Sequence, residues 1–239
     1  MRNIIGVIGG NGVAATNKLC SIIEEHMTRN GAFRDAHHPE MIVWQATQAP
    51  SRSMYLEGRG PSFIEDYVDI AQKMKACGVT HLCMCCNTAH YYINEIEKQI
   101  GGGISFINII EEVVKTSLKT GKMRYGVMCS DGLRKVELYD KWFKHYNPSA
   151  QIIYPDEEFQ KKVTEGICNA KNNIRFNESH LSFPAKLFAE VESHLRQKEA
   201  DVVIGGCTDI RNVYQSTSEL PYVDSLEVLA ESIININKK

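Results

Sequence analysis

The same succession of motifs occurs twice in this 239-residue chain, and that repetition restricts the folds it can adopt. Gly6-Val7, in a short apolar run, is matched by Gly126-Val127, 120 residues further on. Cys86-Asn87-Thr88 is matched by Cys207-Thr208-Asp209, 121 residues further on. One large domain is possible at this length, but the repeat favours two related lobes of roughly 100 to 120 residues, each able to bury a core.

Each half alternates short apolar runs with longer amphipathic stretches, which is typical of parallel strands joined by helices. In the first half we expect strands at 3–8, 41–46, 81–85 and 104–109, with helices from Ala14 and over 62–76 and 91–99. The sequence therefore predicts an α/β fold with two pseudo-symmetric lobes, each a mainly parallel sheet flanked by helices. If the last helix, 225–237, crosses back, residues 1–103 and 215–239 form the first lobe and 104–214 the second.

The charge and the hydrophobic pattern favour small-molecule chemistry. The formal net charge of −2 gives no broad attraction to nucleic acid or to an anionic membrane. No apolar run approaches the roughly 20 residues that span a bilayer, and the N-terminal residues do not read as a signal peptide. We therefore expect a cytoplasmic protein with no nucleic-acid or membrane partner, whose eight cysteines are reduced.

Cys86 and Cys207 each follow an apolar strand that leads into a predicted helix. This position is the carboxyl edge of the sheet, where open α/β folds bind ligands, and a helix N-terminus favours a thiolate. Two thiols facing one cleft could invert a carbon centre, because one removes a proton and the other donates to the opposite face. The polar residues that follow, Asn87, Thr88 and Thr208, could orient a ligand, and His90 could cap or pack near Cys86.

Other roles for the cysteines are buried packing or metal binding. Free cysteine is most often a small buried residue, which is what we expect for the remaining six. Cys83, Cys85 and Cys86 could suggest a zinc or redox cluster, but C-x-C-C lacks the usual C-x-x-C spacing. We predict no metal site.

Residues in the connecting loops suggest a site for a small carboxylate. Gly9-Gly10-Asn11-Gly12 matches neither dinucleotide-binding nor P-loop patterns, whereas a loop around a carboxylate fits it better. Arg52, just beyond the second strand, could bind a carboxylate through two parallel hydrogen bonds, although an arginine in a polar loop is often solvated surface. Lys171 could bind a second carboxylate, or it could be an exposed lysine at a helix end.

Gly9-Gly10-Asn11-Gly12, Cys86-Asn87-Thr88-Ala89-His90 and Gly206-Cys207-Thr208-Asp209-Ile210 together resemble the aspartate/glutamate racemase family. The resemblance covers nearly the whole chain. It implies an active site between two pseudo-symmetric lobes, racemisation without pyridoxal phosphate or metal, and a homodimer. It also assigns the acid/base roles to Cys86 and Cys207. Arg52 matches a carboxylate-binding arginine of the aspartate racemase branch; Lys171 matches a second basic residue less closely, with Arg175 as its competitor.

Several positions depart from the pattern of that branch. Asn11 stands where methionine is frequent, Asp209 where glutamate is common, and Ser130 and Leu133 lie in an altered second-lobe loop. Asn11 and Ser130 remain predicted substrate contacts. The leading hypothesis is a racemase of aspartate, with glutamate as a second substrate. The alternatives are a cysteine-dependent isomerase or decarboxylase of a small dicarboxylate, and a catalytically silent amino-acid-binding protein.

Overall fold

The computed structural model describes residues 2–237, which divide into two compact units. The first unit comprises the residues up to Glu112 together with those from Leu226 onwards, and the second unit runs from Val113 to Ser225. The chain thus passes out of the first unit within helix α5 (Ile109–Leu118) and returns at the start of α10 (Ser225–Asn237).

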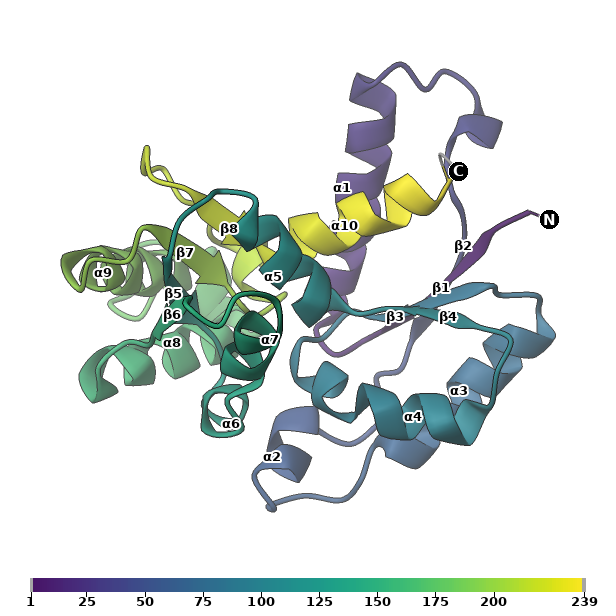
Figure 1. The fold of residues 1–239 in the computed structure, drawn as a ribbon, viewed down its shortest axis with the longest axis horizontal. Coiled ribbons are helices and arrows are strands. Elements are labelled where there is room, and N and C mark those ends of the chain that lie inside the picture. The colour runs from purple at the N-terminus through teal and green to yellow at the C-terminus, as the bar shows by residue number, and fades with distance from the viewer. Residues whose placement is uncertain (1, 238–239) are drawn as a thin grey trace. The chain divides into compact units, whose positions relative to one another are not determined.

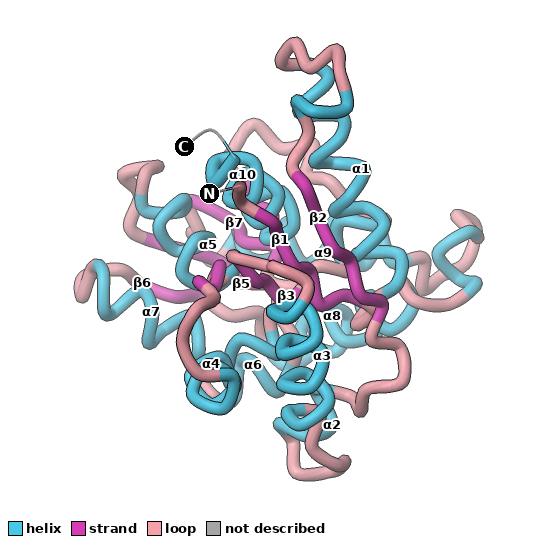
Figure 2. The backbone as a smooth tube through the Cα atoms, turned by 90° about the vertical axis from the view of Figure 1, so that its right-hand side faces the viewer, coloured by secondary structure: helices cyan, strands magenta, loops and turns pink. Residues whose placement is uncertain are grey.

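The first unit contains a four-stranded parallel sheet in the order β2-β1-β3-β4. Its strands are β1 (Ile4–Gly9), β2 (Glu40–Gln45), β3 (His81–Met84) and β4 (Ser105–Ile107). Figure 2 shows β2, β1 and β3 running side by side. The central strand β1 is apolar along its whole length because helices cover both faces of the sheet.

Helices α3 (Ile64–Ala76) and α4 (Ile93–Ile100) lie on one face of this sheet, and α1 (Val13–Arg29) and α10 lie on the other (Figure 1). In α3 the buried residues Tyr67, Ala71 and Met74 recur at helical spacing. Acidic residues occupy its first turn and lysines its last, which suits the helix dipole. A short helix, α2 (Arg52–Leu56), follows β2.

The second unit repeats this topology with the sheet order β6-β5-β7-β8, again all parallel. The strands are β5 (Arg124–Met128), β6 (Gln151–Ile153), β7 (Val202–Gly205) and β8 (Tyr222–Asp224). The helices are α6 (Asp131–Lys135), α7 (Leu138–Tyr146), α8 (Glu157–Asn169) and α9 (Pro184–Gln197). In each sheet the strands are ordered second, first, third and fourth along the chain, so the predicted α/β fold with two similar halves is confirmed.

Some predicted boundaries differ from the structure. The strand expected over 104–109 is limited to β4, because Asn108 accepts hydrogen bonds from the amides of Ile110 and Glu111 and thereby starts α5. Because β4 pairs with β3, and β8 with β7, residues 104–112 belong to the first unit and 215–225 to the second. The unit boundaries therefore lie about ten residues beyond those expected at 103 and 214.

Candidate active site

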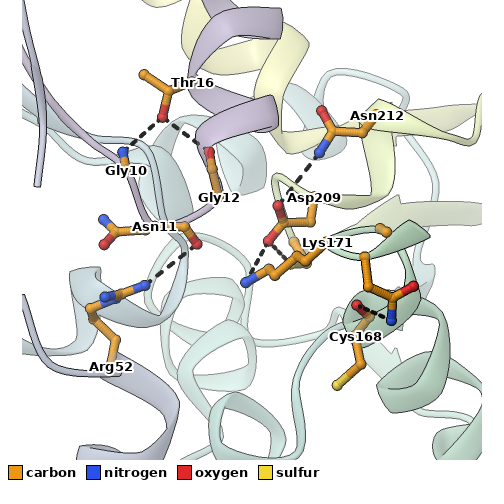
Figure 3. Close-up of polar contacts among 12 residues, drawn as sticks. Gly10, Asn11, Gly12, Thr16, Arg52, Cys168, Lys171, Asp209 and Asn212 are labelled. Carbon is orange, nitrogen blue, oxygen red and sulfur yellow. Dashed lines mark hydrogen bonds and ion pairs between the residues drawn. The ribbon is translucent and has the colours of Figure 1, made fainter. Parts of the chain in front are cut away.

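The loop after β1 has a fixed shape that requires glycine. Gly10 has φ of +79°, and a Cβ there would lie 2.6 Å from the amide nitrogen of Ala46. The amide of Gly10 donates to Thr16 Oγ1 at 3.0 Å, and the Thr16 hydroxyl donates to the carbonyl of Gly12 at 3.2 Å (Figure 3). These contacts join the loop to the first turn of α1 and hold Asn11, whose side chain is only 5% exposed, between them.

Arg52 is the first residue of α2 rather than part of a loop, because the Ser51 hydroxyl accepts the amide of Met54 and caps that helix. Its guanidinium donates to the carbonyl of Pro50 at 2.9 Å. It also donates to the carbonyl of Asn11 at 3.4 Å (Figure 3). Both partners are neutral, and no carboxylate within residues 2–237 forms an ion pair with Arg52. The half-buried guanidinium is thus oriented while its charge stays available to an anion.

Cys86 lies two residues beyond β3, at the carboxyl edge of the first sheet. Its amide donates to the carbonyl of Met84 at 2.8 Å, which turns the chain sharply. The preceding Cys85 is fully buried whereas Cys86 is partly exposed, and the predicted ligand-orienting residues Asn87 and Thr88 are buried beside it. Of the three closely spaced cysteines Cys83, Cys85 and Cys86, Cys86 alone is partly accessible.

His90 is buried and bridges two backbone carbonyls in the first unit. Its Nδ1 lies 2.9 Å from the carbonyl oxygen of Cys86 and its Nε2 3.3 Å from that of Ile107, in β4. A neutral imidazole has one N–H to donate, so it satisfies one carbonyl fully, and protonation would supply the second donor. Burial nevertheless dominates and lowers the pKa of His90 to about 4, against the two carbonyl contacts, which raise it. His90 is therefore neutral at pH 7.

This buried histidine predicts a loss of stability in mild acid. The unfolded chain binds a proton at His90 below a pH of about 6.5, whereas the folded protein binds it only near pH 4. The free energy of unfolding should fall by up to about 3 kcal/mol as the pH drops across that window. Urea unfolding at pH 7 and pH 4.5 would measure it, and His90→Gln should show a smaller decrease. Equal pH dependence in both proteins would contradict this role for His90.

Tyr67, in α3, is a buried residue of this region that the sequence did not single out. Burial raises the pKa of its hydroxyl; the Arg52 guanidinium lowers it, and Cys86 raises it further. These interactions place the hydroxyl near the charged group and the thiol of the first unit. Helical periodicity is a signal for the burial of Tyr67, but nothing in the sequence indicates where its hydroxyl points.

Cys207 occupies the corresponding strand end in the second unit, after β7. The amide of Gly206 donates to the carbonyl of Met128 at 2.8 Å, and a Cβ on Gly206 would lie 3.0 Å from the ring of Tyr139. Cys207 is partly exposed, and its thiol donates to Asp209 Oδ2 at 3.9 Å. The side chains of Thr208 and Asp209 are buried.

A helix does not follow either cysteine directly, which corrects the sequence-based argument for their activation. Cys86 is followed by a 3-10 helix, Thr88–Tyr92, before α4 begins at Ile93. Cys207 is followed by a three-residue 3-10 helix, Ile210–Asn212. The electrostatic effect of a helix acts over its first turn and needs aligned peptides, so a helix dipole does not account for activation of these thiols.

Lys171 and Asp209 form an ion pair in the second unit, with Nζ 2.9 Å from Oδ2 (Figure 3). Asp209 is 2% exposed and Lys171 is 44% exposed. Arg175, the competing candidate, lies with its guanidinium 4.4 Å from the ring centroid of Phe176 and donates to the carbonyl of Ala170. Asp209 therefore contacts both Lys171 and Cys207. Arg175 contacts only neighbouring residues of its own segment among these partners.

Buried groups that follow β5 in the chain interact with Cys207. The Ser130 hydroxyl accepts the amide of Leu133 at 3.4 Å and caps α6. Burial raises the pKa of Cys129, and the neighbouring Cys207 raises it further. Burial likewise raises the pKa of Tyr139 well above its usual value, with contributions from Cys129 and Cys207. Tyr139 is a second tyrosine near a candidate thiol that the sequence did not indicate.

Within residues 2–237 no helix is long and apolar enough to cross a membrane. In the same part of the chain, no three side chains among His, Cys, Asp and Glu are grouped so as to hold a metal ion.

The sequence profile of the family described as Asp/Glu/hydantoin racemase matches residues 5–233. The chain therefore belongs to the Asp/Glu/hydantoin racemase family. It is 24% identical over 234 residues to the broad specificity amino-acid racemase RacX of Bacillus subtilis (strain 168), with 97% of each chain covered.

Solved structures share the fold. The aspartate racemase of Picrophilus torridus has a TM-score of 0.82 at 23% identity, covering 99% of this chain and 95% of that one. The glutamate racemase isoform RacE1 of Bacillus anthracis has a TM-score of 0.65 at 16% identity, covering 99% and 82%. The family resemblance predicted from the paired cysteine motifs is thus confirmed.

Proposed function

We propose that this protein is an amino-acid racemase that interconverts L- and D-aspartate, with glutamate as a second substrate. One observation carries the proposal: at the same strand end of each sheet, a partly exposed cysteine is followed by buried polar side chains. Racemisation by two bases needs a pair of groups that can each take up and release a proton, because the reaction runs in both directions. Cys86 and Cys207 meet that requirement.

In the proposed mechanism the thiolate of one cysteine takes the proton from the α-carbon, and the electron pair of the broken C–H bond moves into the α-carboxylate. The thiol of the other cysteine then gives its proton to the opposite face of that carbon. Each turnover leaves the first cysteine protonated and the second as thiolate, which is the state needed for the reverse reaction. The two thiols thus exchange their roles between the two directions.

Residues near the thiols would stabilise the charge that develops on the carboxylate. Arg52 offers a guanidinium already oriented by two backbone carbonyls. Asn11, Asn87, Thr88, Ser130 and Thr208 are the further proposed contacts. Preorganised donors of this kind lower the barrier because they need no rearrangement as charge develops. Since the thiols move the proton and these donors stabilise the charge, the scheme uses neither pyridoxal phosphate nor a metal. By family resemblance we also propose a cytoplasmic homodimer.

Exchange in D₂O tests the proposal directly. The reduced protein should incorporate deuterium at the α-carbon of L- and D-aspartate, and of glutamate, and should convert each enantiomer into the other without added cofactor. Proton NMR follows the exchange, and chiral chromatography follows the inversion. Release of CO₂, or rearrangement of a dicarboxylate without α-exchange, would instead indicate a decarboxylase or another isomerase. Binding without any exchange would indicate a silent binding protein.

A further inference from the structure

The ion pair beside Cys207 bears on which amino acids the proposed racemase accepts. Lys171, with Arg175 as its competitor, is the residue that the family resemblance matches to a second substrate carboxylate. In the structure its ammonium group lies 2.9 Å from Asp209 Oδ2, and the same oxygen lies 3.9 Å from Cys207 Sγ. The lysine charge is therefore directed at a carboxylate of the protein itself, next to the candidate thiol.

Asp209 is well fixed in this position. Its carboxylate is 2% exposed, and its second oxygen, Oδ1, lies 3.5 Å from Asn212 Nδ2, which donates to it (Figure 3). Asp209 also precedes the 3-10 helix Ile210–Asn212, whose backbone restrains it. A buried carboxylate loses its hydration, so it strongly favours a nearby cation, and losing that cation would be costly. Lys171 is 44% exposed and has a longer side chain than Asp209.

We propose that Asp209 is a specificity-determining residue that neutralises Lys171 and thereby keeps the site from preferring substrates with a side-chain carboxylate. Resting on the proposed racemase function, this names its substrate class: aspartate is accepted, and amino acids with uncharged side chains are accepted comparably well. At distances well beyond the 2.9 Å that separates them, the opposite charges of Lys171 and Asp209 largely cancel. Binding of the α-carboxylate, common to all amino acids, is left to Arg52.

Aspartate and asparagine form the test pair because they have nearly the same shape and differ in charge. The ratio of their kcat/KM values measures the preference for the distal carboxylate, and a loss of rate that affects both substrates equally cancels in it. This matters because Asp209 also contacts Cys207, so its replacement changes the rate as well. Racemisation of both amino acids would be measured for the wild-type protein, Asp209→Asn, and the double variant Lys171→Met with Asp209→Asn.

In Asp209→Asn the lysine charge is released, and the aspartate-to-asparagine ratio should rise by about tenfold or more, since a hydrogen bond to a charged group is worth at least that factor. In the double variant both charges are gone, and the ratio should return to within about threefold of the wild type, because the coupled pair acts as one neutral unit. An unchanged ratio in Asp209→Asn overturns the inference. So does a double variant whose ratio falls far below the wild type, because Lys171 would then have selected the carboxylate in the native site.

Equilibrium binding separates this inference from the proposed function. Isothermal titration calorimetry of the same three proteins with aspartate and asparagine gives the ratio of dissociation constants without requiring turnover. One outcome is that none of the three proteins exchanges the α-proton of its ligand, while the ratio of dissociation constants shifts as expected. The racemase proposal then fails and the role of Asp209 stands. If exchange occurs and neither ratio responds to Asp209→Asn, the racemase proposal stands and the role of Asp209 is refuted.

Discussion

Cys86→Ser and Cys207→Ser should each lower kcat/KM for racemisation by roughly 10²- to 10⁴-fold, the range that a positioned acid/base group contributes. A serine hydroxyl keeps nearly the size of the thiol, but it is far too weak an acid to exist as an anion at neutral pH. Each variant should retain its fold, because both cysteines are partly exposed rather than central to a core. Circular dichroism and thermal unfolding would verify this.

The two serine variants should also differ from each other. With one thiol left, a proton can still leave the face that this thiol serves and return to it. Cys86→Ser should therefore exchange the α-proton of one enantiomer of aspartate with D₂O, and Cys207→Ser that of the other, both with little inversion. Cys77→Ser, at the exposed cysteine after α3, is the matched control and should keep the wild-type rate. Near-normal racemisation in either Cys86→Ser or Cys207→Ser would refute the two-thiol mechanism.

The second large effect is expected from Arg52→Ala. A guanidinium that binds a carboxylate through two charged hydrogen bonds contributes about 1.5–3 kcal/mol for each, so kcat/KM for aspartate should fall by roughly 10²-fold or more. Arg52→Lys keeps the charge but loses the planar arrangement of donors, and it should recover only part of the loss. Steady-state kinetics with both enantiomers would measure these changes.

The control for this prediction is Arg59→Ala, since Arg59 is an exposed arginine paired with Glu57 in the same region of the chain. Its replacement removes the same charge without removing the proposed substrate contact, so its kinetics should match the wild type. Arg52→Ala with unchanged kinetics would show that the guanidinium does not bind the substrate, whatever its orientation in the structure.

Sequence patterns located the candidate thiols because their positions follow from local rules. An apolar run such as Val202–Gly205 predicts a strand, and in a parallel sheet every residue just after a strand lies at the same edge. The repeated spacing then placed Cys86 and Cys207 at equivalent strand ends. The sequence did not indicate that residues 104–112 pack with the first unit: Ile104 begins another apolar run, and a sequence does not state which sheet a short strand such as β4 joins.

Contacts between distant side chains could not be predicted in this way. The ion pair of Lys171 with Asp209 joins a turn after α8 to a strand end nearly forty residues later, and its formation depends on how α8 packs. The pairing of His90 with the carbonyl of Ile107 depends on the register of β3 with β4. Residue types indicated that these groups were polar; packing decided which of them meet.

Helix α10 (Ser225–Asn237) completes the first unit although the second unit precedes it in the chain. This order affects how the protein folds during synthesis on the ribosome. Leu229 and Ile233 of α10 are fully buried, and the side chain of Asn3 donates to the carbonyl of Ile236 at 3.1 Å. Residues up to Glu112 must therefore wait for synthesis of the whole second unit before their core can close. Domains usually fold from the N-terminus during translation. Here the second unit can finish first, while the nascent first unit keeps an apolar face exposed to chaperones.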